Sequence, residues 1–161
     1  RVHLMGSDAI LNEAVKAADI LSDFHVPADV WSVTSYKALY TDAVDTERAQ
    51  PAAPGQEKKS YLSQCLERAE GVFVAATDYL KALPLSVARW IPGPYTVLGT
   101  DGFGRSDGRA ELRSFFENDA RHLALAALYV LAEEDRIDRK TVDEAVGRLD
   151  IGPEKPNPRT R

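Results

Sequence analysis

Four short runs of β-prone residues, each followed by a turn and a helical run, constrain the fold of this chain more than any other feature. They are Val2–Met5, Ala28–Val33, Gly71–Ala76 and Tyr95–Leu98. A strand, a helix and a second strand in succession indicate parallel pairing with a right-handed crossover. The third run is apolar without alternation, which is typical of a central strand covered on both faces. The order therefore predicts an α/β protein.

The segments between these runs show helical periodicity. Apolar residues at a spacing of three and four predict a helix that faces the sheet, with Ser7 as its cap and an end near Asp23. Thr34-Ser35 begins a second, short helix that we expect to end at Tyr40. Two helical runs follow, Ser60–Arg68 and Tyr79–Trp90, and Pro84 should break or kink the second. A further run begins near Arg109, with Ser106 or Asp107 as its cap. The last two runs are Arg121–Glu133, which Asp119 caps, and a run that starts after Asp138 and ends at Gly152.

The length of the chain and the positions of its prolines and glycines predict one domain. A chain of 161 residues fits a single domain with a full core, which we place at residues 1–152. Residues 41–59 lack an apolar period and contain prolines and a glycine, so we expect an exposed insertion there. The tail at 153–161 is polar and rich in proline. Because the chain opens directly into an apolar strand without a methionine, it reads as a fragment of a longer protein.

Charge and composition argue against several kinds of partner. The formal net charge of −5 lacks the basic field that nucleic acid backbones require. The longest apolar run, Leu123–Ala132, is about half a membrane span. The single cysteine, Cys65, suits a reducing compartment such as the cytoplasm, and its pattern predicts a place on the packed side of a helix. We therefore expect no nucleic acid and no membrane as a partner.

We expect the functional edge in the stretch after the fourth strand, because loops at the carboxyl ends of parallel strands form binding surfaces. Its glycines, Gly99, Gly102 and Gly104, are spaced GxxGxG, which is neither the GxGxxG of a dinucleotide fold nor a Walker loop. Asp78 and Asp101 each follow a strand and are expected at the same edge. The candidate interface or anion-binding residues are Asp78, Thr100, Asp101, Gly102, Phe103, Gly104, Arg105 and Arg109.

These candidates have more than one interpretation. Capping and turn hydrogen bonds explain the two aspartates without any ligand. The alternatives are ion pairs with Arg105 or Arg109, or contact with a neighbouring domain. The glycines themselves are explained by backbone angles closed to other residues.

Catalytic and metal-ligating residues are not expected in this chain. His3, His25 and His122 have no partner at metal-ligand spacing, and each is interpreted as a hydrogen-bonded structural histidine. No nucleophile elbow or cysteine-histidine signature is present. We accordingly predict no catalytic, cofactor-binding or metal-binding residue within these 161 positions.

Four blocks carry a resemblance to a known family. They are Val2-His-Leu-Met-Gly-Ser7, Val30-Trp-Ser-Val-Thr-Ser35, Ala76-Thr-Asp-Tyr-Leu-Lys81 and Val97-Leu-Gly-Thr-Asp-Gly-Phe-Gly-Arg-Ser-Asp107. In this order and spacing they resemble the C-terminal domain of the homodimeric pyruvate dehydrogenase decarboxylating component, a transketolase-like enzyme that uses thiamine diphosphate and Mg²⁺. The ending Asn157-Pro-Arg159 is similar too, whereas Asp8 stands where the family usually has glycine.

The resemblance implies a three-layer α/β/α sandwich around a mostly parallel mixed sheet of about five strands. It implies that the domain serves dimer and interdomain packing, and that the cofactor motifs and active-site histidines belong to preceding domains. The parent would then hold thiamine diphosphate and Mg²⁺ upstream, form a homodimer, and pass an acetyl group from pyruvate to the lipoyl carrier of a dihydrolipoyl acyltransferase core. Alone, the fragment would be inert.

Two other functions stay open at this point. A transketolase or related sugar-transferring enzyme shares the fold, and fold does not fix chemistry. A stand-alone regulatory module could bind a small anion or a nucleotide through residues Gly99–Arg105 and the start of the helix that follows.

Overall fold

A sheet of four parallel strands forms the middle layer of the computed structural model, which describes residues 1–52, 54–55, 58–152 and 154–160. The strands are β1 (Val2–Gly6), β2 (Ala28–Ser32), β3 (Val72–Ala76) and β4 (Tyr95–Leu98), in the order β2-β1-β3-β4. The α/β class is confirmed. The sheet has four strands in the described residues rather than about five, and every pairing among them is parallel.

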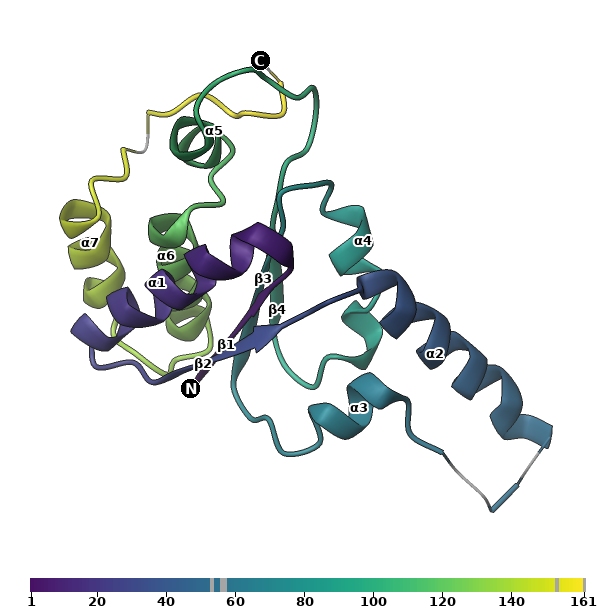
Figure 1. Ribbon diagram of the computed structural model, residues 1–161. Coiled ribbons are helices and arrows are strands. Elements are labelled where there is room, and N and C mark those ends of the chain that lie inside the picture. The colour runs from purple at the N-terminus through teal and green to yellow at the C-terminus, as the bar shows by residue number, and fades with distance from the viewer. Residues whose placement is uncertain (53, 56–57, 153, 161) are drawn as a thin grey trace.

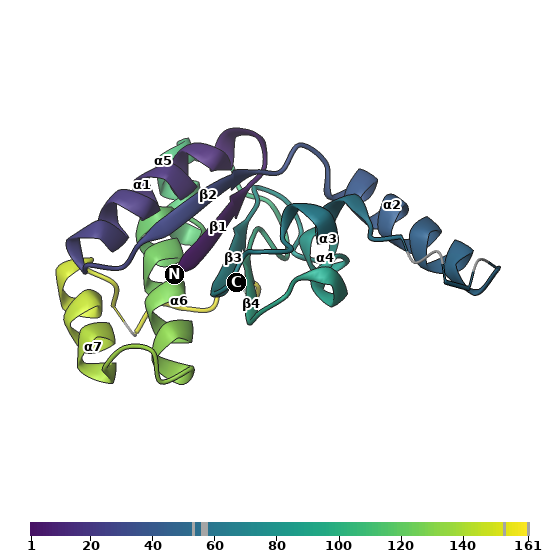
Figure 2. The ribbon, with the colours of Figure 1, turned by 90° about the horizontal axis from the view of Figure 1, so that it is seen from below.

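Helices cover both faces of the sheet (Figures 1 and 2). One face carries the short helix η1 (Asp8–Ile10) and the helices α1 (Leu11–Asp23), α6 (Ala120–Glu133) and α7 (Arg139–Arg148). The other face carries α2 (Tyr36–Ala49), α3 (Tyr61–Cys65), α4 (Ala82–Leu85) and η3 (Ala88–Trp90), with η2 (Gln50–Ala52) after α2. Helix α5 (Arg109–Phe115) lies beyond the carboxyl ends of the strands, at the top of Figure 1. The result is the expected three layers.

Strand β3 shows why the sequence lacks alternation there. All five of its residues are buried. Val72 and Val74 join the core under α1 and α6, whereas Phe73 and Ala75 join the core under α2 and α3. Because successive side chains of a strand point to opposite faces, a strand with helices on both sides needs apolar residues throughout.

Helix α6 is covered by its own chain. Leu123, Ala127 and Leu128 are fully buried, and the helix packs against α1, α7 and β3. Asp119 caps it as predicted, by accepting a hydrogen bond from the His122 amide at 3.0 Å. The nearly all-round apolar surface of α6 is therefore explained within the described residues, apart from Tyr129, which remains exposed.

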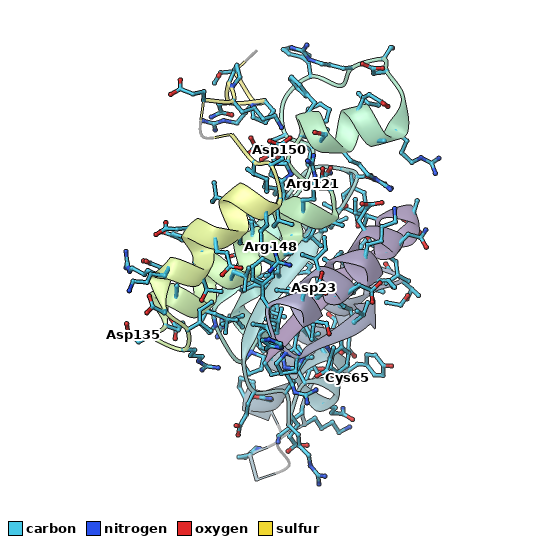
Figure 3. The ribbon with its side chains drawn as sticks, turned by 90° about the vertical axis from the view of Figure 1, so that its left-hand side faces the viewer. Asp23, Cys65, Arg121, Asp135, Arg148 and Asp150 are labelled. Atoms are coloured by element: carbon cyan, nitrogen blue, oxygen red, sulfur yellow. The ribbon has the colours of Figure 1, made fainter. Side chains whose placement is uncertain are left out.

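Helix α7 is tied to its neighbours by two arginines labelled in Figure 3. Arg121 of α6 donates to the Leu149 carbonyl at 3.2 Å, where α7 ends. Arg148 places its guanidinium 4.4 Å from the centre of the Phe24 ring, at the end of α1. Helix α7 starts after Asp138 as predicted, and Asp138 caps it, because its side chain accepts from the Lys140 amide at 2.9 Å.

Two predicted helix caps are wrong. Ser7 makes no cap hydrogen bond; its hydroxyl instead lies 3.1 Å from the Tyr79 hydroxyl, in the loop after β3. Asp8 then turns the chain with a left-handed φ of 53°, a conformation that favours glycine over other residues. At α5 the N-cap is Gly108, and the Asp107 carboxylate accepts a hydrogen bond from the Gly108 amide instead of capping the helix.

Helix α2 runs nine residues past its predicted end at Tyr40, to Ala49. Ser35 caps it through a 3.1 Å bond from the Ala38 amide. The helix continues because Ala43 is buried and Glu47 accepts a 2.9 Å hydrogen bond from the Trp90 indole. The predicted insertion at 41–59 therefore starts as a helix, and its residues 53 and 56–57 lie outside the described part of the chain.

The predicted burial of Cys65 is wrong. Helix α3 ends at Cys65, and its buried residues are Leu62 and, one residue past its end, Leu66. Cys65 is exposed. Among the helices of the described residues, none is long and apolar enough to cross a membrane.

Candidate functional site

The loops that follow β1, β3 and β4 meet at the carboxyl edge of the sheet, as the sequence predicted. We call Gly99–Arg105 the glycine loop. Its start is held against the loop after β3, because the Thr100 amide donates to the Tyr79 carbonyl at 2.9 Å. A Cβ atom at Gly99 would lie 2.8 Å from that same carbonyl oxygen, so only glycine fits this approach.

Asp78 makes an ion pair at this edge, but its partner is Arg113, not Arg105 or Arg109. Arg113 binds Asp78 through two atoms, Nε at 3.1 Å and Nη2 at 2.7 Å. The Arg113 side chain is 9% exposed and the Asp78 side chain 44% exposed. A two-point contact of this kind fixes both side chains in one plane.

Glu13 of α1 completes this cluster, which we call the Arg113 network (Glu13, Asp78 and Arg113). One Glu13 oxygen accepts from Arg113 Nη1 at 3.3 Å and from Lys16 Nζ at 2.9 Å. Its other oxygen accepts from the Ala120 amide at 3.1 Å, in the first turn of α6. The hydrogen bonds from Arg113 to Asp78 are the main cause that raises the pKa of Arg113, and burial opposes them. The network joins α1, α5, α6 and the loop after β3.

Sequence reasoning missed Glu13 and Arg113, although both carried a signal. Glu13 falls three residues after Ile10 and four before Ala17, on the apolar side of α1. Arg113 precedes the buried Phe116 by three residues, on the inner side of α5. A charged residue on the inner face of a helix is buried only when it is paired, so each one predicts the presence of the other.

Asp101 has the turn role that was one of its three interpretations. Its carboxylate accepts from the Lys81 amide at 3.1 Å and lies 3.6 Å from Lys81 Nζ. It therefore fastens the glycine loop to the start of α4. The two predicted aspartates lie at one edge, but each is bound to a different partner.

The rest of the glycine loop is more open. Gly102 has a φ of +91° and packs against the backbone of Arg159 in the tail. Phe103 is 93% exposed, an unusual state for so large an apolar side chain. Arg105 lies 4.3 Å from the centre of the Phe115 ring.

A groove of about 510 Å³ brings several predicted residues together. Asp78, Thr100, Gly104, Arg105 and Arg109 line it, whereas Asp101, Gly102 and Phe103 do not.

The floor of this groove includes a polar group that the sequence did not single out. Asn118 also lines the groove and is 1% exposed. Its amide nitrogen donates to the Thr77 carbonyl at 2.9 Å, but its Oδ1 atom has no hydrogen-bond partner in the described residues. The lining of the groove thus includes the exposed guanidinium groups of Arg105 and Arg109 and a buried hydrogen-bond acceptor, Asn118 Oδ1.

The histidines occupy three different settings. His122 Nδ1 lies 2.7 Å from Asp119 Oδ1 and supports the cap of α6. Burial opposes ionisation of Asp119, but the hydrogen bonds from His122 and Arg121 outweigh it and hold the pKa of Asp119 well below its ordinary value. His25 is exposed in the turn before β2, and His3 is buried at the amino end of β1.

The described residues do not fit thiamine diphosphate with Mg²⁺. They contain no group of three or more histidine, cysteine, aspartate or glutamate side chains that could hold a metal ion. Asp78 and Asp101 are bound to Arg113 and Lys81, so neither carboxylate is placed to coordinate a cation.

Comparison with known proteins gives consistent matches. The sequence model of the transketolase-like TK C-terminal domain matches residues 1–119. The pyruvate dehydrogenase E1 component of Pseudomonas aeruginosa is 47% identical over 160 residues, which cover 98% of this chain and 18% of that protein. The protein of the same name from Escherichia coli K12 is 43% identical over 162 residues, 99% of this chain and 18% of its own length.

A solved structure agrees on the fold. Transketolase from Campylobacter jejuni superposes with a TM-score of 0.53 at 16% identity, over 80% of this chain and 16% of that one. The chain therefore spans less than a fifth of the length of each protein that it matches here.

Proposed function

The chain belongs to the family of transketolase-like C-terminal domains, and from this premise we propose that it is the C-terminal structural and dimerisation domain of a thiamine-diphosphate-dependent pyruvate dehydrogenase component. The observation that carries the proposal is similarity over the whole chain. At 47% identity, 98% of its residues align with a pyruvate dehydrogenase E1 component. The likeness to transketolase, at 16% identity, supports the shared fold alone.

The reaction belongs to the parent enzyme in this proposal. The parent decarboxylates pyruvate and transfers the acetyl group to a lipoyl carrier, which gives acetyl-dihydrolipoamide and carbon dioxide. Thiamine diphosphate and Mg²⁺ are held by the preceding domains, since a cofactor supplies the carbanion chemistry wherever it binds. The partners are those upstream domains, a second copy of the parent and a dihydrolipoyl acyltransferase core, in the bacterial cytoplasm.

The chemistry of the carboxyl edge supports a structural role. The carboxylates of Glu13, Asp78 and Asp101 are each bound to a cation of this same chain. Charged groups that are committed to one another hold loops in place, and they are poorly suited to exchange protons with a substrate. We therefore assign the edge to packing.

The glycine loop is the part of this edge that we assign to contact with a neighbouring domain or a second copy. Its tip presents Phe103, which is 93% exposed, while its start is fastened at Thr100 and Asp101. A large apolar side chain presented to the outside is typical of a residue that packs against a partner surface.

The proposal is tested with two proteins assayed side by side, the 161-residue chain and the full-length enzyme from the same genome. With pyruvate, thiamine diphosphate, Mg²⁺ and an artificial electron acceptor, the full-length enzyme should turn over and the chain alone should not. Xylulose 5-phosphate as donor should give no product with either. Turnover of pyruvate by the isolated chain, or sugar transfer by the full-length enzyme, would refute the proposal.

The assignment of the glycine loop has its own test. In the full-length enzyme, Phe103→Ser should weaken dimer or interdomain packing, seen as a lower thermal midpoint, and Tyr129→Ser is the matched control on α6. If phosphate instead stabilised the isolated chain, and Arg105→Ala abolished the effect, the loop would be an anion site.

A further inference from the structure

A second groove, of about 620 Å³, lies at the opposite edge of the sheet, where β1 and β2 begin. We call it the amino-edge groove. The groove is lined by Arg1, which precedes β1, by His3 of β1, by Trp31 of β2, by Arg68 before β3 and by Arg136 after α6. None of these residues belongs to the glycine loop or to the Arg113 network, so the groove is separate from the site described above.

The charges of this groove favour an anion. Arg68 and Arg136 are exposed and have no ion-pair partner in the described residues. Arg1 is paired with Asp29, Nη1 to Oδ1 at 2.6 Å. Glu70 is the other acidic residue of the lining, so three guanidinium groups face two carboxylates.

His3 forms the buried floor of the groove, and its contacts fix its neutral tautomer. The Trp31 indole N–H, which can only donate, lies 3.2 Å from His3 Nδ1. The Glu70 carbonyl, which can only accept, lies 3.3 Å from His3 Nε2. Nε2 must therefore carry the hydrogen, and Nδ1 must accept from Trp31. The ring is 2% exposed and stacks on Phe73 with centroids 4.6 Å apart.

Protonation of His3 places a hydrogen on Nδ1, the atom that accepts the hydrogen bond from Trp31. A hydrogen on Nδ1 opposes the Trp31 N–H directly, so that hydrogen bond is lost. The nearest acceptor is Asp29 Oδ2, at 3.5 Å from Nδ1. Asp29 can accept from His3 through Oδ2 while its Oδ1 keeps the contact with Arg1. The groove then gains the positive charge of the imidazolium.

The groups around the ring determine whether the pKa of His3 is raised or lowered. Burial is the main cause that lowers the pKa of His3; Arg1 and its α-amino group also lower it, while the Glu70 carbonyl and Asp29 raise it. Arg68, Arg136 and the Cys65 thiol also line the groove. Neutral His3 is thus the state at pH 7.5, and the charged state forms below the ordinary histidine pKa of about 6.5.

We propose that the amino-edge groove binds a small doubly charged oxyanion, such as a sulfate or phosphate group, through Arg68 and Arg136, and that protonation of His3 strengthens this binding. The half-buried Trp31 ring in the wall is the reporter of the change. The site lies outside the function proposed above and stands without it.

The test uses sulfate, because its charge is constant between pH 5 and pH 8. Binding to the 161-residue chain is followed by Trp fluorescence and by titration calorimetry at pH 5.5 and pH 7.5. Protonation of His3 adds positive charge to the groove, so binding should be tighter at the lower pH, by up to about tenfold. Arg68→Ala and Arg136→Ala should each weaken binding at both pH values, whereas Arg48→Ala, an exposed arginine on α2, should leave it unchanged.

The variant His3→Gln tests the pH dependence of binding separately from anion binding itself. Glutamine keeps one donor and one acceptor but takes no proton, so binding at pH 7.5 should persist and its pH dependence should vanish. Should this variant fail to fold, Asp29→Asn removes the negative charge that favours protonated His3 and should reduce the pH dependence between pH 5.5 and pH 7.5. Equal sulfate affinity at the two pH values, or binding unaffected by both arginine variants, would overturn the proposal.

Discussion

At the scale of residues, the stability of the carboxyl edge depends on a few charged side chains that satisfy one another. Arg113 is nearly buried, and it is held by Asp78 on one side and by Glu13 on the other. Removing one member of such a cluster leaves an uncompensated buried charge, which costs more than the intact pairs contribute.

Replacement of Arg113 by alanine is therefore expected to lower the free energy of unfolding by about 3 kcal/mol. The reason is that Glu13, which is 8% exposed, loses the buried one of its two cations, and Asp78 loses its two-point contact. Urea denaturation measures the change. Arg109→Ala, an exposed position on the same helix, is the control and should stay within about 0.5 kcal/mol of wild type. Similar losses in the two variants would show that the network is not stabilising.

Asp119 gives a prediction about pH. Its lowered pKa means that the unfolded state takes up the proton first as the pH falls. The stabilisation is therefore complete above the unfolded pKa, about 4, and is lost as the pH falls through the folded pKa. Asp119→Asn keeps a capping oxygen but removes the charge.

Thermal denaturation of wild type and Asp119→Asn at pH 7 and pH 3 measures this effect. The wild type should be more stable by about 1–2 kcal/mol at pH 7, with a smaller difference at pH 3. A difference that grows toward pH 3 would contradict the assignment.

At the scale of elements, the contact between α1 and α6 is made by small residues. Ala14 and Ala17 of α1 and Ala124 and Ala127 of α6 are all completely buried in one core. Alanines let two helices and the sheet approach closely, so the space between them is set by backbone instead of by side chains. This interface should tolerate enlargement poorly.

Ala17→Leu is expected to destabilise the chain by about 1–3 kcal/mol, because a larger side chain has to displace the packed layer. Calorimetry of thermal unfolding measures it. Ala38→Leu, on the exposed side of α2, is the matched control and should change stability by less than about 0.5 kcal/mol. If Ala17→Leu were neutral, α1 and α6 would have to be less closely packed than the structure indicates.

At the scale of the whole molecule, the C-terminal tail crosses back over the carboxyl edge (Figure 1). Lys155 donates to the Ser114 carbonyl of α5 and lies 3.7 Å from Glu117. The Arg159 backbone packs against Gly102 in the glycine loop. The tail thus restrains the loop that we assign to an interface.

A chain truncated after Gly152 should therefore keep its sheet but lose order in the glycine loop. Hydrogen exchange should become faster in residues 99–105 and stay unchanged in β3, and the thermal midpoint should fall by about 2–4 °C. Unchanged exchange in the loop would show that the tail does not hold it.

The sequence by itself determined the strand order along the chain, the parallel pairing, the double coverage of β3, the cap Asp119 and the start of α7 after Asp138. These features depend on local periodicity and on hydrogen bonds between near neighbours, so a short stretch contains the whole signal. The candidate residues Asp78 and Asp101 were placed at the correct edge for the same reason, since each one ends a strand.

Only the tertiary structure decided which partners these residues take. Arg113 and Glu13 are 100 residues apart in the sequence, and Ser7 and Tyr79, whose hydroxyls are in contact, are 72 residues apart. No local pattern specifies such pairs. The end of α2 was missed for a related reason, because its last turns are held by Trp90 and a few apolar contacts and show no strong period of their own. The prediction that Cys65 is buried was wrong because the short helix α3 ends at Cys65, and the spacing of apolar residues does not reveal where such a helix ends. The physical distinction is between hydrogen bonds made along the chain, which sequence encodes directly, and contacts made across it, which exist only after the layers have packed.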